Sequence, residues 1–117
     1  MEKMKSFLIF FYILDQCYDQ YMEDDLGGFL GAISPELWKD GQPADKAIYN
    51  DWEDSIKIIE TQNIAEVTYK FLESYEQRFG LDFKETKFFL KNKFNEKILK
   101  EAQEKAEKIC QRYYHID

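Results

Sequence analysis

Carboxylates are the side chains with which this sequence could most readily do chemistry. Its 117 residues include 23 Asp and Glu but a single histidine. Three acids stand together at residues 23–25, and five more lie between residues 40 and 54. Clustered carboxylates can bind Ca²⁺ or Mg²⁺, or transfer protons in a hydrolase. The alternating acid spacing of an EF-hand is absent, so helix capping and solubility are the favoured interpretation, with a small carboxylate- or metal-dependent enzyme as the alternative.

Other groups suited to catalysis are scarce. His115 stands close to the C-terminus, where chains commonly fray, which makes it a poor general base. The sequence has no Gly-rich phosphate loop, no nucleophile triad signature and no His-Glu metal spacing. Cys17 and Cys110 fall within helical patterns and are expected to be buried thiols, with a disulfide open to them only in an oxidising compartment. We therefore expect a protein that is not an enzyme and has no catalytic residue, no metal and no cofactor.

Aromatic and acidic residues are interleaved between residues 38 and 54. Trp and Tyr dominate the centres of protein interfaces, and acids beside them steer a basic partner. Trp52 is in helical phase with Ile48 and is predicted to fill the core, whereas Trp38 and Tyr49 fit an interface or a packing role equally well. The candidate partner-binding residues are Glu23, Asp24, Asp25, Trp38, Asp40, Asp45, Tyr49, Asp51 and Asp54.

The charge is large and unevenly distributed. The formal net charge is −7. Residues 1–80 hold 16 acidic and seven basic side chains, whereas residues 81–117 hold seven and nine. A negative surface disfavours binding to nucleic acid and to anionic membranes, because both are themselves negative. A basic protein partner is favoured, although the surplus could also serve solubility alone.

An apolar run at residues 7–14 follows Lys3 and Lys5 and so imitates a signal peptide. The run is short, contains three Phe and a Tyr, and leads into Asp15 without a small-residue cleavage site. It is also too short to span a bilayer. We expect the first helix to be part of the core of a cytoplasmic protein.

The remaining pattern predicts a single all-α domain over residues 1–117, arranged as a four-helix bundle. The first helix covers residues 5–23, the second begins after an Asp45 N-cap, the third extends from an Asn63 cap to Gly80, and the fourth is a long helix starting at Asp82. Four of the five glycines and both prolines fall between the first two helices. That segment is predicted to be a long structured loop, beginning where Gly27 and Gly28 break the first helix.

Parts of this loop and of the second helix resemble a known group of proteins. The motifs are Leu-Gly-Gly at residues 26–28, Asp-Gly-x-Pro-Ala-Asp at residues 40–45 and an acidic residue followed by Trp at residues 51–52. They are similar to motifs in small acidic bacterial immunity proteins that accompany polymorphic or contact-dependent toxins. The resemblance implies a cytosolic inhibitor that binds a toxin domain, often a basic nuclease, and it supplies no catalytic residues. A self-associating structural or adaptor subunit is a further alternative.

Overall fold

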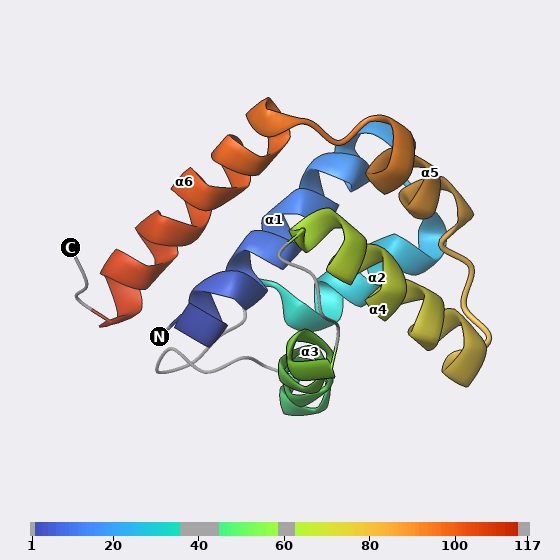
Figure 1. Ribbon diagram of the computed structural model, residues 1–117, viewed down its shortest axis with the longest axis horizontal. Coiled ribbons are helices and arrows are strands. Elements are labelled where there is room, and N and C mark those ends of the chain that lie inside the picture. Colours follow the sequence, from blue (N-terminus) through green and yellow to red (C-terminus); the bar gives the residue numbers. More distant parts are fainter. Residues whose placement is uncertain (1, 36–44, 59–62, 115–117) are drawn as a thin grey trace.

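The computed structural model describes residues 2–35, 45–58 and 63–114. These residues form helices and no strand, so the all-α prediction is confirmed (Figure 1). Six helices are present within the described ranges, where the sequence predicted four. They are α1 (Glu2–Tyr21), α2 (Asp24–Ile33), α3 (Lys46–Ile58), α4 (Ile64–Phe79), α5 (Lys84–Asn92) and α6 (Glu96–Tyr114).

Helix α1 is the centre of the structure, packing against α2, α3, α5 and α6. Figure 1 shows α6 alongside α1. The N-terminal end of α1 and the C-terminal end of α6 lie on the same side, so the two helices are antiparallel. Apolar side chains cover most of the α1 circumference, and Phe7, Leu8 and Ile13 are fully buried. A helix that is apolar on several faces is stable only when neighbours cover it from several directions. The run that imitates a signal peptide is therefore core.

The segment after α1 differs from the predicted loop, because α2 contains three of its glycines. The chain breaks instead at Met22, whose φ of 50° is left-handed. Four buried side chains at helical spacing, Leu26, Phe29, Leu30 and Ile33, form the inner face of α2. Their burial outweighs the low helix propensity of glycine, which is about 1 kcal/mol per residue. The expectation that Gly27 and Gly28 end the first helix is thus wrong.

Gly27 has a packing role in this arrangement. A Cβ atom at this position would lie 2.8 Å from Cε1 of the Tyr18 ring, whereas Cβ atoms at Gly28 and Gly31 would meet nothing within 4 Å. The absence of a side chain at Gly27 therefore allows α2 to approach α1 closely.

The predicted long last helix is divided into α5 and α6. The division falls at residues 93–95, where Asn95 Oδ1 accepts a hydrogen bond from the Ile98 backbone N–H at 2.9 Å. Asn95 is thus a helix N-cap that lies within an otherwise helical pattern. The turn allows α5 to bury Phe89 and Leu90 while α6 buries Ala102 and others against α1.

Three local cap predictions are confirmed. Asp45 Oδ1 accepts from the Ile48 N–H at 3.1 Å and so caps α3. Asn63 Oδ1 accepts from two backbone N–H groups at the start of α4. Gly80 has a left-handed φ of 69° and ends α4, as a glycine C-cap does.

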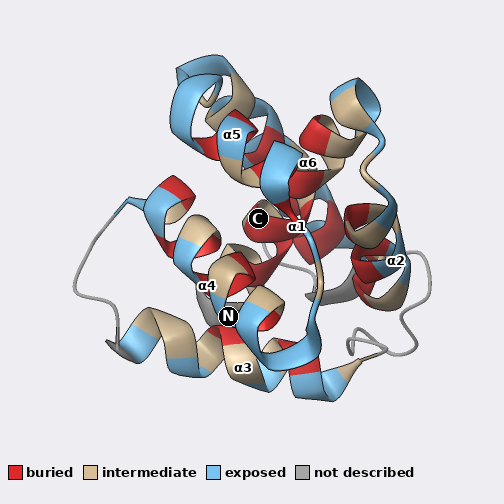
Figure 2. Ribbon diagram, turned by 90° about the vertical axis from the view of Figure 1, so that its right-hand side faces the viewer, coloured by how far each residue is buried: buried red, intermediate tan, exposed pale blue. Residues whose placement is uncertain are grey.

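The core is rich in rings, and a single cluster of buried residues includes members of all six helices. Figure 2 shows buried positions along α1 and on the neighbouring helices. Trp52 is fully buried, so its predicted core role is confirmed. Its ring is stacked on that of Phe10, with 4.2 Å between the ring centres, and is edge-on to that of Phe71, with 5.7 Å between the centres. Cys17 and Cys110 are buried free thiols, and burial raises the pKa of Cys17 to about 12. None of the helices, as far as the structure describes them, has the length and apolar character needed to cross a membrane.

Candidate functional site

An acidic groove of about 420 Å³ lies between the start of α2, the start of α3 and the end of α4. Carboxylates and one guanidinium surround a largely apolar floor. The lining residues are Asp24, Asp25, Gly28, Phe29, Asp45, Ala47, Ile48, Asp51, Tyr75, Arg78, Phe79 and Leu81.

The groove brings together four of the acids that the sequence marked as candidates. Asp24 and Asp25 stand in the first turn of α2, and Asp45 and Asp51 belong to the cap and the second turn of α3. Residues three apart on a helix share a face, so Asp45, Ile48 and Asp51 form one line along α3. Both pairs of acids line the groove together with the buried side chains of Phe29 and Ile48.

Asp51 is the most highly connected of these acids. Its Oδ2 accepts a hydrogen bond from the Tyr75 hydroxyl at 2.6 Å and pairs with Arg78 Nη1 at 3.2 Å. Burial raises the pKa of the Tyr75 phenol, and donation to the Asp51 carboxylate raises it further. The hydroxyl is therefore a permanent donor, which fixes the orientation of the Asp51 carboxylate.

Arg78 lies over two aromatic rings at the edge of the groove. The central carbon of its guanidinium is 5.3 Å from the centre of the Tyr75 ring and 4.9 Å from that of Phe79. Tyr75 is buried, whereas Phe79 is 57% exposed, which is unusual for a large apolar side chain. The groove thus combines a carboxylate, a phenol and an open ring face around one cation.

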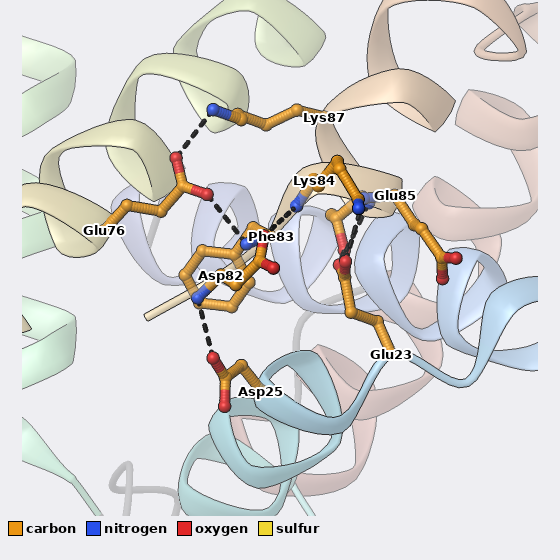
Figure 3. A network of polar contacts seen from close by, with 9 residues as sticks. Glu23, Asp25, Glu76, Asp82, Phe83, Lys84, Glu85 and Lys87 are labelled. Atoms are coloured by element: carbon orange, nitrogen blue, oxygen red, sulfur yellow. Dashed lines mark hydrogen bonds and ion pairs between the residues drawn. The ribbon is translucent and has the colours of Figure 1, made fainter. Parts of the chain in front are cut away.

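Glu23, another candidate, has a structural role outside the groove (Figure 3). Its carboxylate accepts hydrogen bonds from the backbone N–H groups of Glu85 and Thr86, at 2.8 and 3.1 Å, and from the Thr86 hydroxyl at 2.7 Å. It therefore caps α5 from 62 residues away, whereas the sequence pattern indicated only that a helix starts at Asp82. Asp82 Oδ1 accepts from the Lys84 N–H at 3.0 Å instead.

Two further carboxylates hold the segment that leads into α5. Asp25 Oδ2 accepts from the Asp82 N–H at 2.7 Å, and Glu76 Oε2 accepts from the Phe83 N–H at 2.7 Å (Figure 3). Glu76 also pairs with Lys87 at 2.7 Å. Asp25 consequently serves both the groove and the connection between α4 and α5. Sequence reasoning missed Glu76, because a helical Glu gives no local sign that it bonds to a neighbouring loop.

The other candidates are distributed differently. Tyr49 is half-buried, with its ring edge-on to Phe7 at 5.1 Å, so it packs against the core. Asp54 is exposed on α3 and is not part of the groove lining. Trp38 and Asp40 lie outside the described residues.

Tyr75, Arg78 and Phe79 are among the groove residues that the sequence did not mark as candidates. In the sequence, Tyr75 and Phe79 follow Phe71 at four-residue spacing, which is typical of the buried face of a helix. The signal that could have separated them is position, since Phe79 directly precedes the Gly80 cap, where a helix leaves the core. Arg78 stands one residue before this ring and lies over it, as a cation–π contact requires.

The groove combines carboxylates with apolar side chains, an arrangement that is chemically suited to a cation next to an apolar group. Within the described residues, no group of three or more His, Cys, Asp and Glu side chains is arranged to hold a metal ion. Comparisons of the chain with protein-family models, with curated proteins and with solved structures find no match.

Proposed function

We propose that the chain is a non-enzymatic binding protein of the immunity type, which neutralises a basic, nuclease-like bacterial toxin domain in the cytoplasm by direct binding. The observation that carries the proposal is the acidic groove, where four aspartates from two segments of the chain surround an apolar floor. The resemblance to toxin-associated immunity proteins points to the same function.

The balance of charge in the groove favours a basic partner. Its described lining contains four carboxylates and one guanidinium, that of Arg78, so it carries a surplus of three negative charges. Such a surface accelerates association with a positively charged protein and disfavours nucleic acid. A nuclease domain is basic where it binds phosphate, and it would therefore be attracted to this face.

The apolar part of the groove favours a protein over a small ion. A metal ion or a free amine gains nothing from the Phe29, Ile48 and Leu81 side chains that form the floor. Protein interfaces, by contrast, have an apolar centre with a polar rim, and exposed rings such as Phe79 commonly serve as their anchors.

The test is a charge-neutralised groove in a binding assay with a basic, toxin-like nuclease domain, which is sought first in the gene next to the one that encodes this chain. The variant replaces Asp24, Asp25 and Asp45 by Asn. Asn caps a helix as well as Asp does, and its amide oxygen can accept the Asp82 N–H bond made by Asp25. We expect nearly unchanged melting, an association rate lowered about tenfold at low salt with a smaller effect at physiological salt, and loss of protection in co-expressing cells.

The matched control removes three charges elsewhere. Glu101, Glu104 and Glu107 are exposed on α6, and their replacement by Gln changes the net charge equally. Equal loss of binding in both triple variants would show that only net charge matters, and unchanged binding in both would reject the groove as the contact face. Self-association broken by the groove variant would support the adaptor alternative, and a melting temperature raised by Ca²⁺ or Mg²⁺ would support the metal-dependent one.

A further inference from the structure

The groove already contains a bound guanidinium, which belongs to the protein itself. Arg78 reaches across the edge of the groove to the Asp51 carboxylate, at 3.2 Å, with its planar cation over the rings of Tyr75 and Phe79. The side chains of Arg78 and Asp51 are 51% and 32% exposed. An ion pair so open to water holds its partner only weakly.

The groups around this cation are those that distinguish arginine from other cations. A carboxylate supplies charge-assisted hydrogen bonds, and ring faces stack on the flat guanidinium better than on the compact ammonium of lysine. The Tyr75 hydroxyl donates to the same Asp51 oxygen at 2.6 Å. The Asp51 carboxylate is therefore oriented by a contact that does not involve the cation.

We propose that Asp51, Tyr75 and Phe79 form an arginine subsite that Arg78 fills in the free protein and that an arginine of a basic protein partner takes over on binding. The inference rests on the proposed function, because that function supplies the partner. Arg78 lies in the last turn of α4, two residues before the Gly80 cap, so its side chain can turn to solvent without disturbing the helix. Arg78 then competes with the partner and restricts binding to ligands that present a true guanidinium.

The occupant is an arginine on a protein because of what surrounds the subsite. Asp24, Asp25 and Asp45 line the same groove and attract further positive charge. The apolar floor, with Phe29 and Leu81, suits the aliphatic stem of an arginine and an apolar neighbour in the partner chain. Free polyamines carry charge without a planar group or an apolar neighbour.

The experiment titrates the full chain with the dipeptide probe acetyl-Leu-Arg-amide, followed by backbone NMR at low salt. The same peptide with lysine or with uncharged citrulline in place of arginine provides the comparison. In Arg78→Ala, we expect the arginine probe to bind about fivefold more tightly than to the original protein, because the affinity is no longer reduced by the fraction of subsites that Arg78 fills. The lysine probe should gain less, and the citrulline probe nothing.

Lys84→Ala is the matched control for charge, since Lys84 is an exposed cation near the groove that is not part of its lining. If both variants gain equally, the effect is electrostatic attraction alone and the proposal is overturned. It is also overturned if no variant binds the arginine probe, if lysine binds as well as arginine, or if spermidine displaces the arginine probe as well as arginine-amide does.

Two more variants test the subsite from its other side. Asp51→Asn should weaken the arginine probe about fivefold or more, while Asp54→Asn on the same helix should not. If Asp51→Asn lowers the melting temperature, Phe79→Ala replaces it, because that ring is largely exposed and its loss should reduce the preference for arginine over lysine. If the arginine probe binds but no toxin domain does, the arginine subsite is supported and the proposed function is rejected. If a toxin domain binds equally well to the variants at Arg78, Asp51 and Phe79, the proposed function is supported and the arginine subsite is rejected.

Discussion

The strongest structural prediction concerns Glu23, whose truncation should destabilise the fold although the residue stands in a surface turn. Its carboxylate accepts three hydrogen bonds at the start of α5, two of them from Thr86, which is fully buried. A buried donor left without its acceptor costs about 1–3 kcal/mol, and loss of a negative charge at a helix N-terminus costs up to about 1 kcal/mol more. The Glu85 N–H is exposed and can bond to water instead. Glu23→Ala should therefore lower the free energy of unfolding by about 3 kcal/mol.

The expected shift of the melting temperature is about 10 °C for a domain of this size. Urea unfolding followed by far-UV circular dichroism and by the fluorescence of buried Trp52 measures the free energy directly. Glu23→Gln keeps an oxygen for Thr86 and loses mainly the bond to Glu85, so it should cost about 1 kcal/mol. The original protein should therefore be the most stable of the three, Glu23→Gln less stable and Glu23→Ala the least stable.

The control is the neighbouring acid. Asp24→Ala also removes one negative charge, but from an exposed side chain one residue further along the chain. It should lower the free energy of unfolding by only about 0.3 kcal/mol, through the α2 dipole. If Glu23→Ala and Asp24→Ala have the same stability within about 0.5 kcal/mol, the assigned cap does not hold α5. If Glu23→Gln is as unstable as Glu23→Ala, the charge matters and the hydrogen bonds do not.

Two further predictions concern α1 and α2. Gly27→Ala should be about 1–2 kcal/mol less stable than Gly31→Ala, because both gain helix propensity but only a Cβ at Gly27 collides with the Tyr18 ring; equal urea midpoints would contradict this packing. Burial raises the pKa of Cys17 from 9.0 to about 12, so between these values the folded protein keeps a proton that the unfolded chain loses. Stability should therefore fall as pH rises through this window, by up to about 1.4 kcal/mol per pH unit, and Cys17→Ala should remove that part of the fall in alkaline urea titrations. A pH dependence identical in the two proteins would place the effect elsewhere.

Local signals in the sequence predicted much of the fold. The caps at Asp45, Asn63 and Gly80 depend on the chemistry of one residue and its immediate neighbours, and all three are present. The apolar run at residues 7–14 also predicted that the first helix belongs to the core, where the structure places it. Such features need no knowledge of distant parts of the chain, which is why they could be derived from the sequence alone.

The errors arose where a distant contact outweighs local propensity. Gly27 and Gly28 argue against a helix, yet α2 forms because its four apolar side chains find a surface on the core. The break before Asn95 is the opposite case, since a helix-favouring stretch is divided so that α6 can pack along α1. Neither result follows from propensity without the tertiary partner.

The candidate site was predictable in part for the same reason. Helical spacing is enough to put Asp45 and Asp51 on one face of α3, but their meeting with Asp24 and Asp25 depends on α2 being a helix that lies near α3. Arg78 and Phe79 joined the groove through the end of α4, and no spacing rule connects them with Asp51, 27 residues earlier. The number and spacing of acidic residues therefore predict the negative charge of the site but not the Arg78 and Phe79 side chains beside it.

The adjacent acids Glu23 and Asp24 have different roles, since the first stabilises the fold and the second is assigned to binding. The Glu23 carboxylate is engaged by backbone and side-chain donors of α5, whereas Asp24 is exposed in the lining of the groove. If the assignment is right, Glu23→Gln changes stability with little effect on partner association, and Asp24→Asn has the opposite effect. The two variants carry equal charge, so net charge cannot produce that exchange of effects. Opposite effects of the two variants require that Glu23 acts through its bonds to α5 and Asp24 through its place in the groove.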